Sequence, residues 1–95
     1  MITNLCIVTA YCACKLCCGS QAQGITASGL RPIEGITIAA SRKIPFGTKM
    51  YIENVGWRVV QDRLAKKYDS RIDLYFARHK DALQFGKKKL KVIRK

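Results

Sequence analysis

The clearest structural signal in the sequence is the stretch Lys49-Met50-Tyr51-Ile52-Glu53-Asn54-Val55-Gly56-Trp57-Arg58-Val59-Val60-Gln61-Asp62. Residues 49–53 alternate, so Met50 and Ile52 would share one face of a strand. Residues 54–56 are typical of a hairpin connection, and residues 57–62 fit the returning strand. The stretch therefore predicts an antiparallel pair of short strands.

Further short strands are expected around this hairpin, at Thr3–Tyr11, Ile36–Ala40, Ile72–Phe76 and Lys89–Ile93. The spacing in His79–Phe85, followed by Gly86, predicts one short helix, and residues 63–70 fit either a loop or one helical turn. Short strands at regular intervals favour a small barrel, which leaves no exposed sheet edge. A chain of 95 residues is expected to form a single, mainly β domain over residues 1–95.

The N-terminal segment Met1–Ala13 is apolar, but it lacks a basic leader, and further cysteines follow at once. It therefore predicts a strand rather than a signal peptide. The longest apolar runs are strand-sized and fall short of the roughly 20 residues that a membrane-spanning helix needs.

The charge is strongly positive and uneven. The net charge is +12, yet Lys15 is the only charged residue before Arg31, and the chain ends in the basic run Lys87–Lys95. Such a field attracts polyanions, including nucleic acid, anionic wall polymers and acidic lipids. The alternative is a solvated tail that keeps the protein soluble. The run lacks the interleaved aromatic residues that single-strand nucleic-acid binders use for stacking.

Four of the five cysteines crowd together, at Cys12, Cys14, Cys17 and Cys18, with Cys6 apart. An odd number cannot all pair within one chain. The cluster has thiolates that could bind a structural zinc, and disulfides across the loop are the rival interpretation. We favour one or two disulfides with Cys6 free, and we expect no cofactor beyond that alternative zinc. A catalytic thiol is not expected, because no histidine lies near the cluster in sequence.

Six segments in order give the chain a resemblance to the 3D (three-aspartate) domain family of cell-wall lytic enzymes. They are Val8–Cys12, Gly24–Gly29, Ile44–Thr48, Val60–Asp62, Arg71–Phe76 and Ala82–Gly86. The resemblance runs from about Ile7 to Ile93 and includes the barrel of lytic transglycosylase A and stationary-phase secreted muralytic proteins. It implies a six-stranded double-psi β-barrel with one or two short helices.

The resemblance also implies an activity. The family's enzymes cleave the glycan strands of peptidoglycan without water and leave a 1,6-anhydro sugar. The expected partners are therefore peptidoglycan glycan strands and anionic wall polymers. The expected location is extracellular or wall-associated, for a bacterial or phage-borne protein.

The family's aspartates carry over in part. The acid/base position matches Asp73, and the second aspartate matches Asp62, eleven residues earlier, although Arg63-Leu64 replaces the Thr-Gly that usually follows. The first family aspartate matches Ala40, which Ser41 follows. One of the three carboxylates is therefore absent, and Ser41 is a candidate to compensate.

One carboxyl group suffices for this chemistry, provided that it is protonated at the working pH. A free aspartate has a pKa of about 3.9, so the pKa of Asp73 must be raised. A neighbouring Asp62 would raise it, whereas Arg71, on the same strand face as Asp73, would lower it. The alternative role for both aspartates is an ion-pair network with the surrounding cations.

The remaining candidates are weaker. Thr9, Tyr11 and Ser41 are candidate substrate-binding residues, with ordinary strand packing as the alternative for Thr9 and Tyr11. Tyr75 fits a core position better than a sugar-stacking one, and His79 fits the surface. The sequence thus predicts a peptidoglycan-cleaving enzyme, and the alternatives are an inactive module that binds wall or polyanion and a nucleic-acid binder that uses the basic C-terminus.

Overall fold

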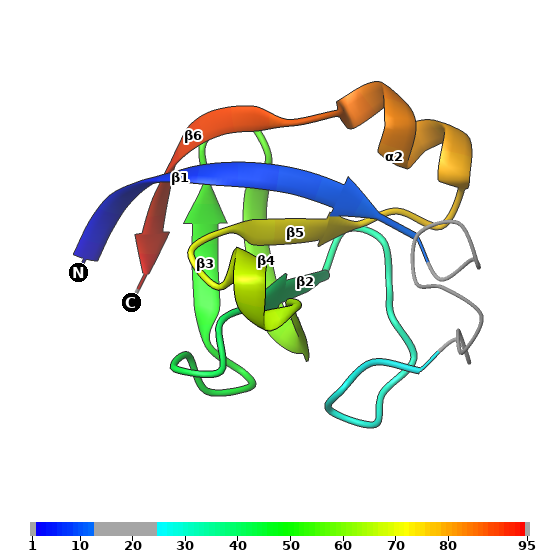
Figure 1. Ribbon diagram of the computed structural model, residues 1–95, viewed down its shortest axis with the longest axis horizontal. Helices are drawn as coiled ribbons and strands as arrows, with labels where there is room; N and C mark the ends of the chain where they lie inside the picture. The colour runs from blue at the N-terminus through cyan, green and yellow to red at the C-terminus, as the bar shows by residue number, and fades with distance from the viewer. Residues whose placement is uncertain (1, 13–24, 95) are drawn as a thin grey trace.

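The structure is a computed structural model that describes residues 2–12 and 25–94. Six strands close into a barrel (Figure 1): β1 (Ile2–Tyr11), β2 (Thr37–Ala40), β3 (Lys49–Ile52), β4 (Gly56–Arg63), β5 (Ile72–Tyr75) and β6 (Lys88–Arg94). Their order around the barrel is β1-β5-β2-β4-β3-β6. The prediction of a small, mainly β barrel is confirmed.

The strand pairing is mixed. The pairs β1–β5 and β2–β4 are parallel, and the other four neighbouring pairs are antiparallel. The predicted hairpin joins β3 to β4, where Asn54 and Gly56 adopt positive φ angles of 63° and 112°. Asparagine and glycine are the residues that tolerate this conformation in tight turns.

The core follows from the alternation of each strand. One face of every strand turns into the barrel, and the buried cluster there consists of Val8, Ile38, Ala40, Met50, Ile52, Val60, Ile72, Leu74 and Val92. Burying a side chain of this size stabilises a fold by roughly 1.5–3 kcal/mol. These residues define the inside of the barrel, so their neighbours along each strand define its outer face.

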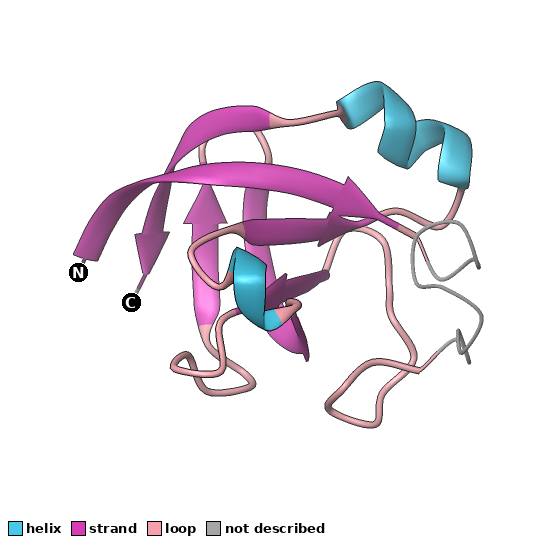
Figure 2. Cartoon of the chain, viewed as in Figure 1, coloured by secondary structure: helices cyan, strands magenta, loops and turns pink. Residues whose placement is uncertain are grey.

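Two short helical segments lie outside the barrel (Figure 2). The 3-10 turn η1 (Lys66–Tyr68) follows β4, and it decides between the two alternatives for residues 63–70 in favour of a helical turn. The helix α2 (His79–Phe85) lies between β5 and β6, as predicted, and ends at Gly86 with a φ of 70°. Its Phe85 packs against Phe76 beyond the end of β5, with the ring centroids 5.7 Å apart.

The C-terminal lysines belong to the barrel. Residues 88–94 form β6, which pairs with β1 on one edge and β3 on the other. These residues are therefore a strand rather than a free tail, and Lys88, Lys89 and Lys91 are exposed to solvent on it. Neither of the described helical segments is long and apolar enough to cross a membrane.

Candidate functional site

Two aspartates lie in one lateral row on the outside of the barrel. Thr9 of β1 pairs with Asp73 of β5, Asp73 pairs with Ala39 of β2, and Ala39 pairs with Asp62 of β4. Laterally paired residues present their side chains on the same face of a sheet. The neighbours of Asp73 along β5 point into the core, so this row faces outward.

A shift in register brings Asp62 into the row. Between Ile38 and Ala39 of β2, the partners on β4 advance from Val60 to Asp62, which leaves Gln61 as an extra residue. Val60 faces the core, and regular alternation would turn Asp62 toward the core as well. The extra residue reverses the alternation, as a β-bulge does, and Asp62 lies outside.

The pKa of Asp73 is raised to about 6. Burial of the carboxyl is the largest cause, and the negative charge of Asp62 adds to it. The hydrogen bond from Thr9 Oγ1 to Asp73 Oδ1, 3.1 Å long, lowers the pKa, as does the charge of Arg71. The guanidinium of Arg71 lies over the ring of Tyr68, at 4.4 Å, and its effect does not outweigh burial.

Asp62 is held by three donors. Tyr11 donates its hydroxyl to Oδ2 at 2.8 Å, and the backbone amides of Ala27 and Arg63 donate to Oδ1, each at 2.9 Å. These bonds fix the orientation of the carboxylate and connect it to the loop before β2. The expectation that Asp62 and Asp73 lie on adjacent strands is wrong, because β2 lies between β4 and β5 and puts Ala39 between them. The charge of Asp62 still acts on the pKa of Asp73.

Aromatic rings adjoin the row. Tyr11 and Tyr75 are paired across β1 and β5, and their rings meet edge to face with centroids 5.6 Å apart. Both side chains are half-buried, and Tyr75 lies outside the core cluster that we expected it to join. Thr9 and Tyr11 thus each hold one of the two aspartates.

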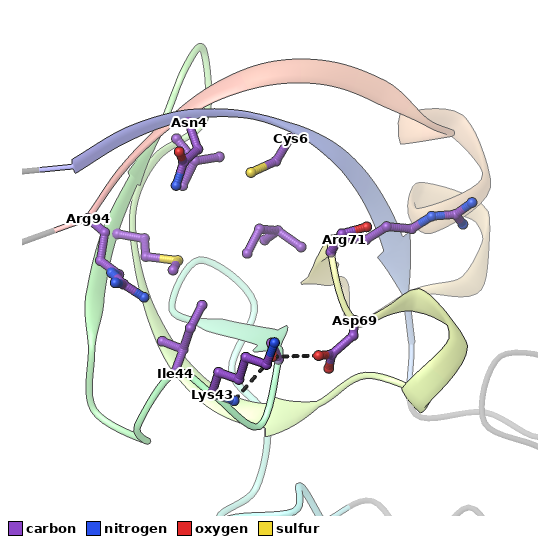
Figure 3. Close-up of a pocket in the computed structure, with 12 residues that line it drawn as sticks. Asn4, Cys6, Lys43, Ile44, Asp69, Arg71 and Arg94 are labelled. Carbon is purple, nitrogen blue, oxygen red and sulfur yellow. Dashed lines mark hydrogen bonds between the residues drawn. The ribbon is translucent and has the colours of Figure 1, made fainter.

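Ser41 lies just beyond the end of β2 and bonds to a further aspartate. Its side chain is buried, its Oγ donates to Asp69 Oδ2 at 2.9 Å, and the amide of Lys43 donates to Ser41 Oγ at 3.1 Å. It lines a cavity of about 470 Å³ among inward-facing residues such as Cys6 and Met50 (Figure 3). Its hydroxyl is therefore bonded to Asp69 rather than to Asp62 or Asp73, and its role in substrate binding stays a prediction.

The residue that matches the first family aspartate, Ala40, does not lie in the row of Thr9, Asp73, Ala39 and Asp62. Ala40 is fully buried in the core cluster, so a carboxylate there would point into the barrel. The residue between Asp62 and Asp73 is Ala39, whose side chain is 3% exposed. A third carboxylate on the outer face would therefore have to replace Ala39.

The cysteines are only partly described. Cys12 follows β1 and is buried, and its Sγ lies 3.4 Å from Nδ1 of His79, at the start of α2. His79 is thus half-buried rather than a surface residue, and the sequence separation concealed this contact. Burial raises the pKa of the Cys6 thiol.

The predicted cysteine cluster includes Cys14, Cys17 and Cys18, which lie outside the described residues, so its disulfides or zinc stay a prediction. Within residues 2–12 and 25–94, no three histidine, cysteine or acidic residues gather in a metal-binding group.

The sequence matches no family model. It is 28% identical over 85 residues to a protein of Bacillus subtilis (strain 168) that carries the provisional name cell wall shaping protein YabE. The similarity covers 88% of this chain and 21% of the relative, so the chain spans about a fifth of the relative's length.

Proposed function

We propose that this barrel acts on the bacterial cell wall and cleaves peptidoglycan glycan strands by lytic transglycosylase chemistry, with Asp73 as the acid and then the base. The name of the Bacillus subtilis relative supports a role at the wall. The observation that carries the catalytic proposal is the pKa of Asp73, raised to about 6 by burial beside a second carboxylate.

The chemistry needs one carboxyl group that changes roles. Protonated Asp73 gives its proton to the glycosidic oxygen, and the bond between that oxygen and the anomeric carbon breaks. The sugar's own C6 hydroxyl then bonds to the anomeric carbon and gives its proton to the Asp73 carboxylate. The acid is regenerated, and no water is consumed. Proton transfer by a positioned side chain typically accelerates such steps by about 10²–10⁴-fold.

A pKa of about 6 suits both roles, because the protonated and ionised forms are both populated near that pH. Asp62 has a supporting role, since its charge raises the pKa of Asp73. Thr9 and Tyr11 are positioning residues beside the proposed substrate site, because each donates to one of the two carboxylates.

The proposal extends to the family, the domain and the location of the protein. We assign residues 1–95 to one domain of the 3D family with double-psi winding, in a protein that is extracellular or bound to the wall. The two parallel pairs, β1–β5 and β2–β4, support that winding, since they require crossover connections.

A second candidate is an inactive module that binds wall or polyanion. Its support is the hydrogen bonding of Asp62, whose two carboxylate oxygens accept three bonds within the protein. The row also has Ala39 where a third carboxylate would lie. A carboxylate held in this way is equally suited to bracing the loop before β2.

Digestion of purified peptidoglycan, with mass spectrometry of the released fragments, separates the two candidates. The enzyme is expected to release fragments that end in 1,6-anhydro-muramic acid, each one water lighter than a hydrolysis product. Asp73→Asn should abolish this release, and Asp81→Asn, the same change in the first turn of α2, should not. Release that survives Asp73→Asn unchanged would refute the assignment of the acid, and no release by the unaltered protein would favour the binding module.

A further inference from the structure

An aromatic pair is exposed on the outer face of the hairpin. Tyr51 of β3 and Trp57 of β4 are cross-strand partners, and their rings meet edge to face with centroids 5.4 Å apart. Trp57 is 50% exposed and Tyr51 39% exposed. The exposed pair presents apolar ring surface that a partner can cover.

Trp57 borders a hollow of about 560 Å³, which is lined by Gly35, Ile36, Lys49, Trp57, Arg58 and Val59. This volume is within the range of small-ligand sites. Its described lining contains two cations and no carboxylate. Arg58 Nη1 donates to the backbone oxygen of Trp57 at 2.8 Å, which fixes the position of this cation at the hollow.

The hollow and the carboxylate row share the outer surface of β4. Trp57 lies five residues before Asp62, which corresponds to roughly 16 Å along a strand at about 3.3 Å per residue. Both side chains lie outside the barrel because of the extra residue at Gln61. A polymer lying along β4 could therefore contact both places at once.

We propose that the hollow at Trp57 is a sugar-binding subsite, which takes a pyranose ring of the same wall glycan whose bond lies at Asp73. This inference rests on the proposed function. The indole offers a flat apolar face to the C–H groups of a pyranose ring, and Ile36 and Val59 extend that apolar surface. Lys49 and Arg58 complement the carboxylates that wall sugars and their peptides carry.

A nucleic acid is the competing partner, because bases also stack on aromatic rings. Its affinity, however, depends on many contacts between cations and phosphates. The hollow supplies two cations, while the other four lining residues are uncharged. This lining fits a sparsely charged sugar polymer better than a polyphosphate.

The chain contains one tryptophan, so its fluorescence reports directly on this hollow. Soluble glycan chains, freed of their stem peptides, should change the emission of Trp57 in a saturable way. An oligothymidylate at the same concentration should change it less. A stronger response to the oligonucleotide than to the glycan would overturn the proposal.

The contribution of Trp57 to wall binding is tested by measuring how much of each variant is retained on purified sacculi. Trp57→Ala should weaken binding about tenfold, the loss expected from removing one ring contact, and Trp57→Phe should lose less. Tyr68→Ala, which removes a comparably exposed ring from η1, should bind as the unaltered protein does. Undiminished retention of Trp57→Ala would overturn the subsite.

Asp73→Asn distinguishes the proposed catalysis by Asp73 from the proposed sugar binding at Trp57. This variant should bind sacculi normally and release no anhydro fragments. If Asp73→Asn still releases anhydro fragments, the assignment of Asp73 as the acid fails. The retention of Trp57→Ala on sacculi remains an independent test of the sugar-binding subsite. In the active protein, Trp57→Ala should raise KM and leave kcat nearly unchanged, since the ring is distant from the reacting bond.

Discussion

Thr9 Oγ1 donates a hydrogen bond of 3.1 Å to Asp73 Oδ1, between two residues that are directly paired across the parallel strands β1 and β5. The bond stabilises the carboxylate and lowers the pKa of Asp73, while burial raises it further than the bond lowers it. The hydroxyl of Thr9 therefore limits how far burial raises the pKa of Asp73.

Thr9→Val should raise the pKa of Asp73 above its present value of about 6, because the nearly isosteric change removes the donor. If Asp73 is the acid, the alkaline limb of the profile of kcat/KM against pH should move to higher pH. Thr48→Val is the matched control, since its hydroxyl donates to Pro45 O within a turn. An alkaline limb that stays in place, or moves to lower pH, would contradict the role given to Thr9.

Asp73 should also make the folded protein less stable as the pH rises. The group binds its proton more tightly in the folded state, with a pKa of about 6, than in the unfolded chain, at about 3.9. Its contribution to stability is present in full below the unfolded pKa and is lost as the pH rises through the folded pKa. A shift of about two units corresponds to at most about 3 kcal/mol.

Urea unfolding at pH 4 and pH 7.5, in reducing buffer, measures this contribution. Asp73→Asn cannot ionise, so its stability relative to the unaltered protein should rise between the two pH values by up to about 3 kcal/mol. Asp81→Asn should not reproduce this rise. An equal pH dependence for Asp73→Asn and the unaltered protein would show that the carboxyl titrates as it does in the unfolded chain.

Tyr11→Phe should lower the free energy of unfolding at pH 7 by about 1–2 kcal/mol, because it removes a hydrogen bond to the Asp62 carboxylate. The edge-to-face contact with Tyr75 needs only the ring and should survive. Denaturant unfolding measures the loss. Tyr51→Phe serves as the control on the exposed hairpin, and an equal loss in both variants would mean that the bond to Asp62 contributes nothing.

The sequence predicted the strands well because each has its own local pattern. The alternation of Met50 and Ile52 shows in the sequence which face of β3 is buried, and Asn54 marks the turn. The positions of the candidate site residues relative to one another depend on pairing between strands that are distant in sequence. Neither β2 between the two aspartates nor the contact of Cys12 with His79 has a local signal, because parallel pairing and crossover are set by the whole barrel.

The position that matches the first family aspartate shows the same limit. Counting residues from the Ile-Pro-Phe-Gly turn leads to Ala40, whose side chain faces the core, as that of Ile38 does two residues earlier. The register of β2 against β4 is broken between Ile38 and Ala39 by the extra residue Gln61 on β4, which reverses the side chains of β4 that follow it and puts Asp62 opposite Ala39. Ala39 is consequently the residue that lies between the aspartates.

A pair of substitutions one residue apart tests this register. Ala40→Asp would place a carboxyl group in the core without a partner and should cost about 4 kcal/mol or more, enough to unfold a small barrel. Ala39→Asp would join the outer row, where a third carboxylate repels its neighbours and should raise the pKa of Asp73 further. Because Ala39 is itself only 3% exposed, this variant should also lose stability, but less than Ala40→Asp, and it should be most stable at low pH, where the new group is protonated.

The milder variants Ala40→Ser and Ala39→Ser keep the comparison measurable if Ala40→Asp does not fold. A hydroxyl at position 40 must be buried among apolar side chains, whereas at position 39 it lies beside two carboxylates that can accept its hydrogen bond. Ala40→Ser should therefore lose more stability in urea than Ala39→Ser. Equal losses, or a larger loss at position 39, would mean that the register of β2 against its neighbouring strands is wrong and that Ala39 does not lie between Asp73 and Asp62.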